Sequence, residues 1–469
     1  NSYARALRAR DVGPGRRVAL YASNRPEWIV ALFGILKAGA SAVLVSPAWK
    51  LTEVRHAVGL TDPHLTIGEA VSAEVVEAAG AARGAICLDD PAPAGWSSFW
   101  EMLDPEPGRR LELDLDPETT EAVLPFSSGT TGLPKAVRHA HRSLLVSALQ
   151  WKIALGMTAD DRLQTYTPLS HILGVANLGA GLASGAAQRL FARFDVDALL
   201  SSIERDRISL GIAVAPVALA LADHPELERY DLSSLRYFDW CATPVTPEVA
   251  ERFTRRTGVR WHTAYGATEA PVLTANPVHR PDLWRTDSPG LPGADVEMRV
   301  VDLQTRETLP PGESGEIVVR GPNLMLGYLP EEANREAFLE GGWYRTGDVG
   351  WMEPEGWLHL TDRVKEMIKV SGFQVAPAEV EGVLLGHPAV ADCAVFGVPD
   401  PTRGQVPRAA VVRRPGAEVA ADELIAYAGE RLAGYKRLSG VDFIDEVPRT
   451  ASGKALRRVL AEKARSGAD

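Results

Sequence analysis

The densest group of reactive side chains in this 469-residue sequence lies between residues 125 and 144. The stretch reads PFSSGTTGLPKAVRHAHRSL and carries five serine and threonine hydroxyls. Gly129 and Gly132 let the backbone approach a ligand without a Cβ in the way, the loop N–H groups can form a concave nest, and Lys135 adds positive charge. The spacing is not that of a Walker A motif. The stretch predicts an anion-binding loop, with an ordinary surface turn as the alternative.

Two later stretches carry carboxylates in Gly-containing segments. AYGATEA, at 264 to 270, sets Tyr265 and Glu269 beside a glycine, which suits an aromatic ring for stacking an adenine and a carboxylate for recruiting Mg²⁺. WYRTGDVGW offers Asp348, whose carboxylate could accept both hydroxyls of a ribose. The alternatives are an ordinary surface acid and a turn-forming aspartate.

Two basic stretches lie closer to the C-terminus. DRVKEMIKVSGFQ contains Arg363, Lys365, Lys369 and Gln374, and PRTASGKALRR places Lys454 in a small-residue loop at the start of a helix. A solvated charged face and an exposed lysine beside a helix cap would explain these stretches equally well if each stood alone. The order of all five stretches is therefore what decides between the interpretations.

The elements that must position these residues belong to a large globular protein. After strand-like EAVLPF and before helix-like HRSLLVSALQWKIAL, the first loop is predicted to join a strand to a helix. Strand-like and helical patterns alternate up to about residue 280, which favours parallel sheets with crossover helices. Short Gly- and Pro-punctuated strands then predict an antiparallel barrel or meander, and helices and strands alternate again from about residue 364. We expect an α/β N-terminal domain over 1–363, whose N-terminal end is incomplete, and an α+β C-terminal domain over 364–469.

Composition excludes several classes of protein. The 61 acidic against 50 basic residues give a net charge of -11, which argues against a nucleic-acid partner. Cys87, Cys241 and Cys393 are far apart and lack C-x-x-C spacing, so neither disulfides nor a zinc site is expected, and a reducing, cytoplasmic location fits. No apolar run approaches the roughly eighteen residues of a membrane span.

Taken in order, the motifs resemble those of the adenylate-forming superfamily: acyl-CoA synthetases, peptide-synthetase adenylation domains and firefly luciferase. The similarity covers nearly the whole chain and is greatest to the 4-coumarate CoA ligase type. It is carried by SSGTTGLPKAV, PLSHILG, YDLSSLRYFDWCATPVTPEV, YGATEA, GPNLMLGYL, YRTGDVG, DRVKEMIKVSGFQVAPAEVE and PRTASGKALRR. The fold that this resemblance implies is a large N-terminal domain of two α/β sheets plus a small β-barrel, followed by a small mobile domain.

The resemblance also implies a set of ATP- and AMP-binding residues. They are Ser127, Ser128, Gly129, Thr130, Thr131, Gly132, Lys135, Ala242, Thr243, Pro244, Thr263, Ala264, Tyr265, Gly266, Thr268, Asp348, Arg363 and Lys454. The 127–135 loop would cradle the phosphates, Asp348 and Arg363 would hold the ribose, and Glu269 would bind Mg²⁺.

Catalytic roles are implied for Lys454, His171, Lys369 and Gln374. Lys454 would bridge the substrate carboxylate and the α-phosphate. The C-terminal domain would then rotate about Lys365, bringing Ser371 and Gly372 to the thiol side of the site.

The acid pocket departs from the common family pattern. Its residues by resemblance are His171, Leu173, Asn177, Trp240, Cys241 and Ala267. Ser170 stands where an aromatic residue is commoner, and Trp240 with Cys241 replaces the usual Ser-Gly. His171 would contact the carboxylate, with a packed core histidine as the alternative. An aryl or medium-sized apolar acid is the expected substrate.

Three functions remain open on sequence alone. The first is an acid:CoA ligase that uses ATP, Mg²⁺ and coenzyme A. The second is a stand-alone adenylation enzyme that loads the phosphopantetheine of an acyl carrier protein or passes the acyl group to another nucleophile; Ser371, where lysine is frequent, slightly favours it. The third is a nucleotide-regulated binding protein without turnover, against which Lys454 and Glu269 count. Either a monomer or a homodimer is expected.

Overall fold

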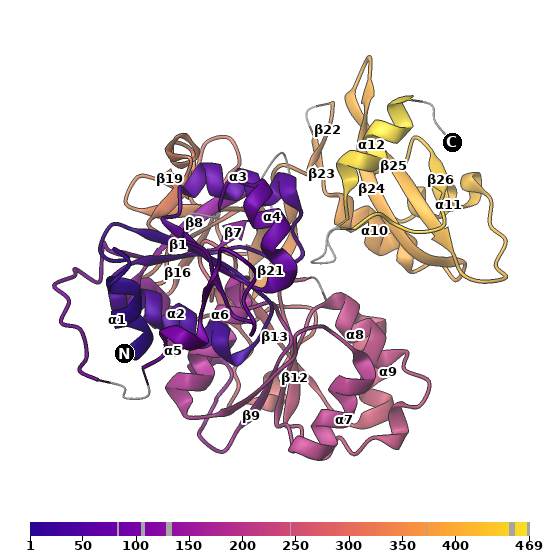
Figure 1. Ribbon diagram of the computed structural model, residues 1–469. Coiled ribbons are helices and arrows are strands. Elements are labelled where there is room, and N and C mark those ends of the chain that lie inside the picture. The colour runs from indigo at the N-terminus through magenta and orange to yellow at the C-terminus, as the bar shows by residue number, and fades with distance from the viewer. Residues whose placement is uncertain are drawn as a thin grey trace. The chain divides into compact units, whose positions relative to one another are not determined.

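A computed structural model describes residues 1–81, 84–104, 108–127, 134–243, 245–371, 373–449 and 455–466 of the chain (Figure 1). The chain divides into two compact units. Unit 1 comprises residues 1–213, 217–297 and 319–344, and unit 2 comprises 214–216, 298–318 and 345–469. This division reflects packing, whereas the predicted boundary between residues 363 and 364 marks where a domain is expected to rotate. That boundary therefore stays a prediction.

The first sheet of unit 1 has a parallel centre and an antiparallel edge. Its order is β18 (Gly327–Leu329), β8 (Lys135–Ala140), β6 (Glu121–Leu124), β2 (Ser41–Leu44), β1 (Arg17–Tyr21), β3 (Leu65–Gly68), β4 (Ile86–Cys87) and β5 (Ser97–Ser98), with β7 (Phe126–Ser127) on β8. The strands from β6 to β5 pair in parallel, whereas β8 is antiparallel to β6, β7 and β18.

Both faces of this sheet are covered. The helices nearest in sequence are α1 (Ser2–Arg8), α2 (Pro26–Ala38), α3 (Leu51–Thr61) and α4 (Ala73–Ala78). Along β1, Val18 and Leu20 enter a core shared with α2, while Ala19 and Tyr21 enter a second core shared with α3. A strand buried on both faces is typical of parallel sheets flanked by helices.

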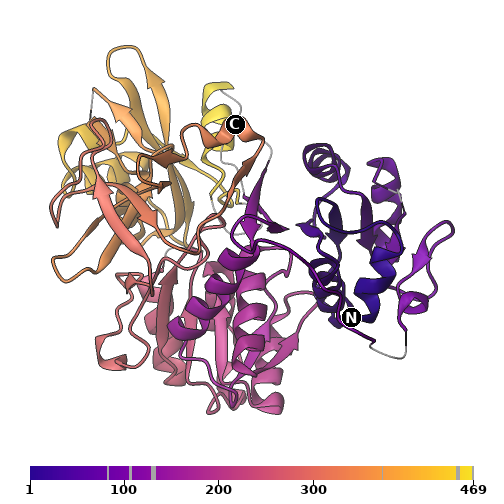
Figure 2. The same cartoon turned by 90° about the vertical axis from the view of Figure 1, so that its left-hand side faces the viewer.

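The second sheet of unit 1 also lies between helices. Its order is β10 (Ala187–Leu190), β9 (Arg162–Thr165), β11 (Leu210–Ala213), β12 (Tyr237–Trp240), β13 (Trp261–Tyr265), β14 (Thr274–Ala275) and β15 (Leu291–Pro292). Its helices are α5 (His141–Ala154), α6 (Ile172–Ser184), α7 (Val196–Asp206), α8 (Ala215–Ala222) and α9 (Pro247–Thr257). Tyr237 packs with α5 residues, and the next residue, Phe238, contacts Phe253 of α9 on the other face. In Figure 2 the strands of the first sheet from β1 to β8 are coloured indigo to purple, and most strands of the second sheet are magenta.

Helix α6 belongs to the cores of both sheets. Ile172, Val175 and Leu178 pack into the core of the first sheet, and Ala176 and Ala180 pack into that of the second. The run ILGVANLGAGLAS is apolar apart from Asn177 and Ser184, as expected of a helix with no solvent face along most of its length. Its first turn is therefore fixed by two sheets at once.

Two further sheets follow. The third has the order β16 (Glu297–Val301), β17 (Gly315–Arg320), β20 (Trp343–Met352), β19 (Phe338–Leu339), with β21 (Leu358–Arg363) on β20. The fourth, in unit 2, has the order β23 (Phe373–Val375), β22 (Ile368–Val370), β25 (Gly404–Arg413), β24 (Val390–Asp400), with β26 (Val441–Phe443) on β25. Its helices are α10 (Pro377–Leu385), α11 (Ala421–Gly429) and α12 (Arg457–Ser466).

The predicted fold class is confirmed. Two helix-flanked sheets, a small β region and an α+β C-terminal part follow one another as expected. In the described part of the chain, no helix combines the length and the apolar character that crossing a membrane requires.

Candidate active site

Two paired strands flank the predicted phosphate loop. Ser127 ends β7 and Lys135 begins β8, and the two residues are direct antiparallel partners. Ser128, Gly129, Thr130, Thr131 and Gly132 lie outside the described residues. The expectation of a strand-to-helix loop was wrong, because β8 intervenes before α5 begins at His141. The KAVRHA run pairs on both sides and forms a strand, which the helical periodicity after it concealed.

The ammonium group of Lys135, at the start of β8, lies over an aromatic ring. Its Nζ lies 4.9 Å from the centre of the Tyr328 ring on β18. The Tyr328 hydroxyl donates to Oε1 of Glu269 at 2.7 Å and lies 3.0 Å from the Tyr344 hydroxyl. The predicted loop lysine and the predicted metal carboxylate are thus joined through one tyrosine. Sequence reasoning missed Tyr328 as a site residue, although it lies in the quoted GPNLMLGYL motif.

The YGATEA segment turns sharply after β13. A Cβ on Gly266 would lie 2.1 Å from the carbonyl oxygen of Pro271, so only glycine fits. Ala267 and Ala270 exchange backbone hydrogen bonds of 2.9 and 3.2 Å, which closes the turn. Tyr265, Thr268 and Glu269 are half-buried at its rim, whereas Thr263 and Ala264 are buried in the strand.

A buried histidine hydrogen-bonds to the backbone of the YGATEA turn. His139 of β8 is fully buried, and its Nε2–H donates to the carbonyl oxygen of Thr268 at 2.7 Å. Burial lowers the pKa of His139 to about 4, so the imidazole is neutral at pH 7. His139 was not among the predicted site residues. In the sequence, His139 is one polar residue in the short run KAVRHA, which by itself does not mark a site residue.

Glu269 fits the requirement for a phosphate-bound magnesium ion. Its carboxylate is half-buried and held at one oxygen by Tyr328. Among the described residues, no three His, Cys, Asp or Glu side chains cluster as a metal site. Mg²⁺ in phosphate-handling sites commonly has one or two protein carboxylates, with waters and phosphate oxygens completing its coordination. A lone, oriented carboxylate is therefore an adequate protein ligand set, and its role stays a prediction.

His171 is the N-cap of α6. Its side chain is exposed, and its Nδ1 accepts the N–H of Leu173 at 3.2 Å. Nδ1 is therefore the hydrogen-bond acceptor for the first turn of α6. The alternative of a packed core histidine does not apply to this exposed ring. Contact with the substrate carboxylate stays a prediction.

The other predicted pocket residues differ in exposure. Leu173 is half-buried, but Asn177 is fully buried, with Oδ1 accepting from Trp151 Nε1 at 2.7 Å and Nδ2 donating to Thr167 Oγ1 at 3.1 Å. Both polar ends of Asn177 thus bind protein groups. Ala267 is half-buried in the YGATEA turn.

The predicted residues that follow β12 mark a tight backbone turn. Trp240 is 1% exposed and its Nε1 donates to Thr243 Oγ1 at 3.2 Å. Cys241 is buried, which raises the pKa of its thiol well above the usual range. Ala242 is exposed and has a φ of 62°, an unusual conformation for alanine. Pro244 lies outside the described residues.

Unit 2 brings together the two residues predicted to hold a ribose. Asp348 of β20 and Arg363 of β21 are direct strand partners, and Arg363 Nε donates to Asp348 Oδ1 at 2.8 Å. The Asp348 side chain is 15% exposed, so the ion pair is partly shielded from solvent. One carboxylate oxygen is thereby oriented by the arginine.

The remaining predicted residues of unit 2 lie along β22 and around it. Lys365, Lys369 and Ser371 are exposed, and Ser371 has a φ of 50°. Lys369 is the strand partner of Gln374. Gly372 and Lys454 lie outside the described residues, so their roles stay predictions.

A half-buried charge cluster in unit 2 was not predicted from the sequence. Arg457, in the first turn of α12, forms an ion pair with Glu366 and a second, at 2.9 Å, with Glu381 of α10. Burial raises the pKa of Glu381 and lowers that of Arg457. The cluster ties α12, which begins three residues after Lys454, to the segment that follows Arg363.

This fold, with a lysine and an oriented carboxylate beside a Ser-, Thr- and Gly-rich hairpin, is that of an adenylate-forming enzyme. Residues 1–329 match the AMP-binding enzyme family, and residues 379–454 match the AMP-binding enzyme C-terminal domain. The chain belongs to the AMP-binding enzyme family, in its branch of AMP-forming acyl-CoA ligases.

Three similar proteins illustrate this membership. The rice (Oryza sativa subsp. japonica) 4-coumarate–CoA ligase-like 9 is 34% identical over 98% of this chain and 85% of its own length. A feruloyl-CoA synthase of Amycolatopsis sp is 36% identical over 97% of this chain and 90% of its own. The structure of the amide bond synthetase McbA from Marinactinospora thermotolerans matches with a TM-score of 0.89 and 31% identity, covering 98% of this chain and 92% of that one.

Proposed function

We propose that this protein uses ATP to activate a carboxylic acid as an acyl adenylate and then transfers the acyl group to the thiol of coenzyme A. The observation that carries the proposal is the chain of contacts from Lys135 over the Tyr328 ring to the Glu269 carboxylate. It sets a cation and an anion at fixed positions beside the hairpin that carries the hydroxyl- and glycine-rich loop. A triphosphate with its metal ion requires both charges.

The first step is slow without a catalyst because it joins two anions. One oxygen of the substrate carboxylate attacks the α-phosphorus of ATP, an O–P bond forms, and the bond to pyrophosphate breaks. Catalysis is then mostly positioning and positive charge. Lys135 would steady the departing pyrophosphate, and Lys454 would stabilise the α-phosphate. Glu269 would hold Mg²⁺, which neutralises phosphate oxygens when bound.

The second step passes the acyl group to sulfur. The thiol loses its proton, sulfur attacks the carbonyl carbon of the adenylate, and AMP leaves with its phosphate oxygen. We propose that residues 364–469 rotate about Lys365 between the steps, so that Lys454 serves the first and the Ser371–Gly372 side serves the second.

An aryl or medium-sized apolar acid is the proposed substrate class. Leu173 offers half-buried apolar surface next to His171. The names of two relatives, a coumarate ligase-like protein and a feruloyl-CoA synthase, point to aromatic acids. The three cysteines are free, which supports a reducing, cytoplasmic compartment as part of the proposal.

Transfer to a different nucleophile is the second candidate. Ser371 lacks the positive charge that would help to hold the phosphates of coenzyme A, and an amide bond synthetase is among the similar structures. A carrier-protein thiol or an amine would then replace coenzyme A.

One panel of assays separates these candidates. Pyrophosphate release is measured for aryl, fatty and amino acids, with coenzyme A, a phosphopantetheinylated carrier protein or an amine as acceptor. We expect ATP-dependent release with aryl acids and a thioester with coenzyme A. Amide formation alone would replace the proposal by the second candidate, and no release with any acid would refute adenylation.

A further inference from the structure

The turn that follows β1 reaches from the first sheet of unit 1 to the second. Asn24, in this turn, is 7% exposed. Its Nδ2 donates to the carbonyl oxygens of Thr165 at 3.3 Å and Thr167 at 3.0 Å, and its Oδ1 accepts the N–H of Leu169 at 2.7 Å. One side chain thus makes three hydrogen bonds with the backbone segment that joins β9 to α6.

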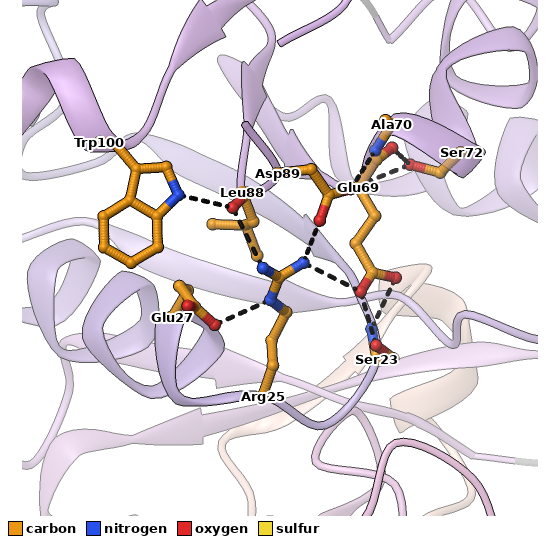
Figure 3. A network of polar contacts seen from close by, with 9 residues as sticks. All are labelled: Ser23, Arg25, Glu27, Glu69, Ala70, Ser72, Leu88, Asp89 and Trp100. Atoms are coloured by element: carbon orange, nitrogen blue, oxygen red, sulfur yellow. Dashed lines mark hydrogen bonds and ion pairs between the residues drawn. The ribbon is translucent and has the colours of Figure 1, made fainter. Parts of the chain in front are cut away.

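Ion pairs and hydrogen bonds hold the turn itself in place (Figure 3). Arg25 donates to Glu27 at 2.8 Å, to Asp89 at 2.5 Å and to Glu69 at 3.4 Å. Ser23 also donates to Glu69, from its N–H at 3.1 Å and its hydroxyl at 2.5 Å. Ser23, Glu69 and Asp89 follow the carboxyl ends of β1, β3 and β4, so three adjacent strand ends fix the position of this turn.

The segment that Asn24 holds leads directly to His171. The N–H of His171 donates to the carbonyl of Pro168 at 2.9 Å. A Cβ on Gly174 would lie 2.1 Å from that same carbonyl oxygen, so the segment and the first turn of α6 are in close contact. A shift of residues 165–169 must therefore move the N-cap residue His171.

We propose that Asn24 is a positioning residue that sets the place of His171 and the start of α6 for the bound acid. The proposal rests on the proposed function, in which His171 contacts the substrate carboxylate. Asn24 does not touch the reacting atoms. It transmits the fixed geometry of the three strand ends to the acid side of the site, while Glu269 and Lys135, on the ATP side, are held by Tyr328.

The test compares Asn24→Asp with a matched control, Gln164→Glu. The aspartate keeps the acceptor for Leu169 but loses both donors and faces two carbonyl oxygens. Gln164 is 1% exposed on β9, and its Nε2 donates to the carbonyl of Leu199 on α7 at 2.8 Å. The control thus makes the same amide-to-carboxylate change at the residue just before the segment, in a side chain whose hydrogen bonds go to α7 and not to residues 165–169.

We expect Asn24→Asp to raise the KM for the acid about 10-fold and to change the KM for ATP less than twofold, because lost positioning of one substrate weakens its binding. Gln164→Glu should lower the melting temperature similarly and change neither KM. Should the aspartate variant fail to fold, Arg25→Lys, which removes the forked contacts but keeps the charge, is expected to change the two KM values in the same way and less strongly. Equal changes in both KM values, or the same pattern in Gln164→Glu, would overturn the proposal.

A second readout does not depend on turnover. The imidazole signals of His171 in ¹⁵N-histidine spectra, assigned with His171→Gln, should shift in Asn24→Asp and stay in place in Gln164→Glu. An unmoved His171 signal in Asn24→Asp refutes the positioning role even if the enzyme is active. If the signal shifts in Asn24→Asp but the unmutated protein adenylates no acid, the proposed function is refuted and the positioning role is not.

Discussion

Glu269 is the residue whose chemistry can be tested with the least structural disturbance. Its Oε1 accepts a hydrogen bond from Tyr328, and the amide oxygen of glutamine can accept the same bond. Glu269→Gln therefore removes the charge and leaves the contact. The substitution therefore tests the charge of Glu269 separately from its packing.

We expect Glu269→Gln to lower the rate of pyrophosphate release on the order of 100-fold, because a neutral ligand holds Mg²⁺ poorly. Higher Mg²⁺ should restore part of the loss. Tyr328→Phe is the matched control: it keeps the carboxylate charge, so its activity loss should be smaller and insensitive to Mg²⁺. Full activity of Glu269→Gln at low Mg²⁺ would place the metal elsewhere.

Leu173 is the better probe of the acid pocket than Asn177. Removing the Asn177 amide would leave the buried Trp151 N–H without its acceptor, which costs about 1–3 kcal/mol of stability whatever the substrate. The pocket role predicted for Asn177 is therefore hard to separate from its structural one. Leu173 is half-buried and apolar, and its side chain can be shortened without stranding a polar group.

Leu173→Ala should change the order in which aromatic acids of different size are used, with KM for ATP nearly unchanged. A methylene contact in an apolar pocket is worth about 1–3 kcal/mol, or roughly 10- to 200-fold in discrimination. The measurement is kcat/KM for a size series of acids. An unchanged order together with weakened ATP binding would remove Leu173 from the acid pocket.

At the scale of elements, β8 contributes two residues to the candidate site. Its first residue, Lys135, faces Tyr328, and His139 supports the YGATEA turn at Thr268. The supporting bond requires an Nε2–H, and burial lowers the pKa of His139 to about 4. The unfolded chain, with an ordinary histidine pKa near 6.5, binds a proton more readily than the folded protein does.

This difference predicts a pH dependence of stability. The unfolded state binds more protons between about pH 6.5 and pH 4, so the contribution of His139 is fully present above pH 6.5 and is lost as the pH falls through this window. The loss amounts to about 3 kcal/mol of unfolding free energy. Glutamine can donate the same bond without titrating, so His139→Gln should flatten the slope measured by denaturant unfolding between pH 4 and 7. An unchanged slope would assign the acid sensitivity to other groups.

Sequence patterns reached part of this arrangement. Tyr265, Glu269, Asp348 and Arg363 were predicted as site residues because each lies within a short motif, and strand pairing brings Asp348 and Arg363 together. Tyr328 and His139 were missed because they meet Glu269 and Thr268 through pairing of segments far apart in the sequence. The strand β8 was missed because its six residues precede a strongly helical stretch. Local patterns thus pointed to candidate residues, whereas the side chains that hold those residues in place depend on tertiary pairing.

At the scale of the whole molecule, the proposal assigns the two half-reactions to two faces of the C-terminal region. Lys454 would act only during attack on ATP, and Gly372 would line the path of the thiol. If residues 364–469 rotate between the steps, each residue should matter for one step and not for the other. A rigid enzyme would instead use a single arrangement for both.

Lys454→Ala should lower the rate of adenylate formation by about 100-fold or more, since a charge that stabilises a transition state is commonly worth about 3 kcal/mol. The same variant, given chemically prepared acyl adenylate, should transfer the acyl group to coenzyme A at close to the original rate. Gly372→Trp should show the reverse, with normal adenylation and blocked transfer. Single-turnover measurement of each half-reaction in each variant provides the readout.

Lys463→Ala, which removes a charge from α12 nine residues further along, is the control and should affect neither step. Equal losses in both steps for Lys454→Ala and for Gly372→Trp would contradict the rotation, because a domain that alternates between two positions cannot need the same residue equally in both.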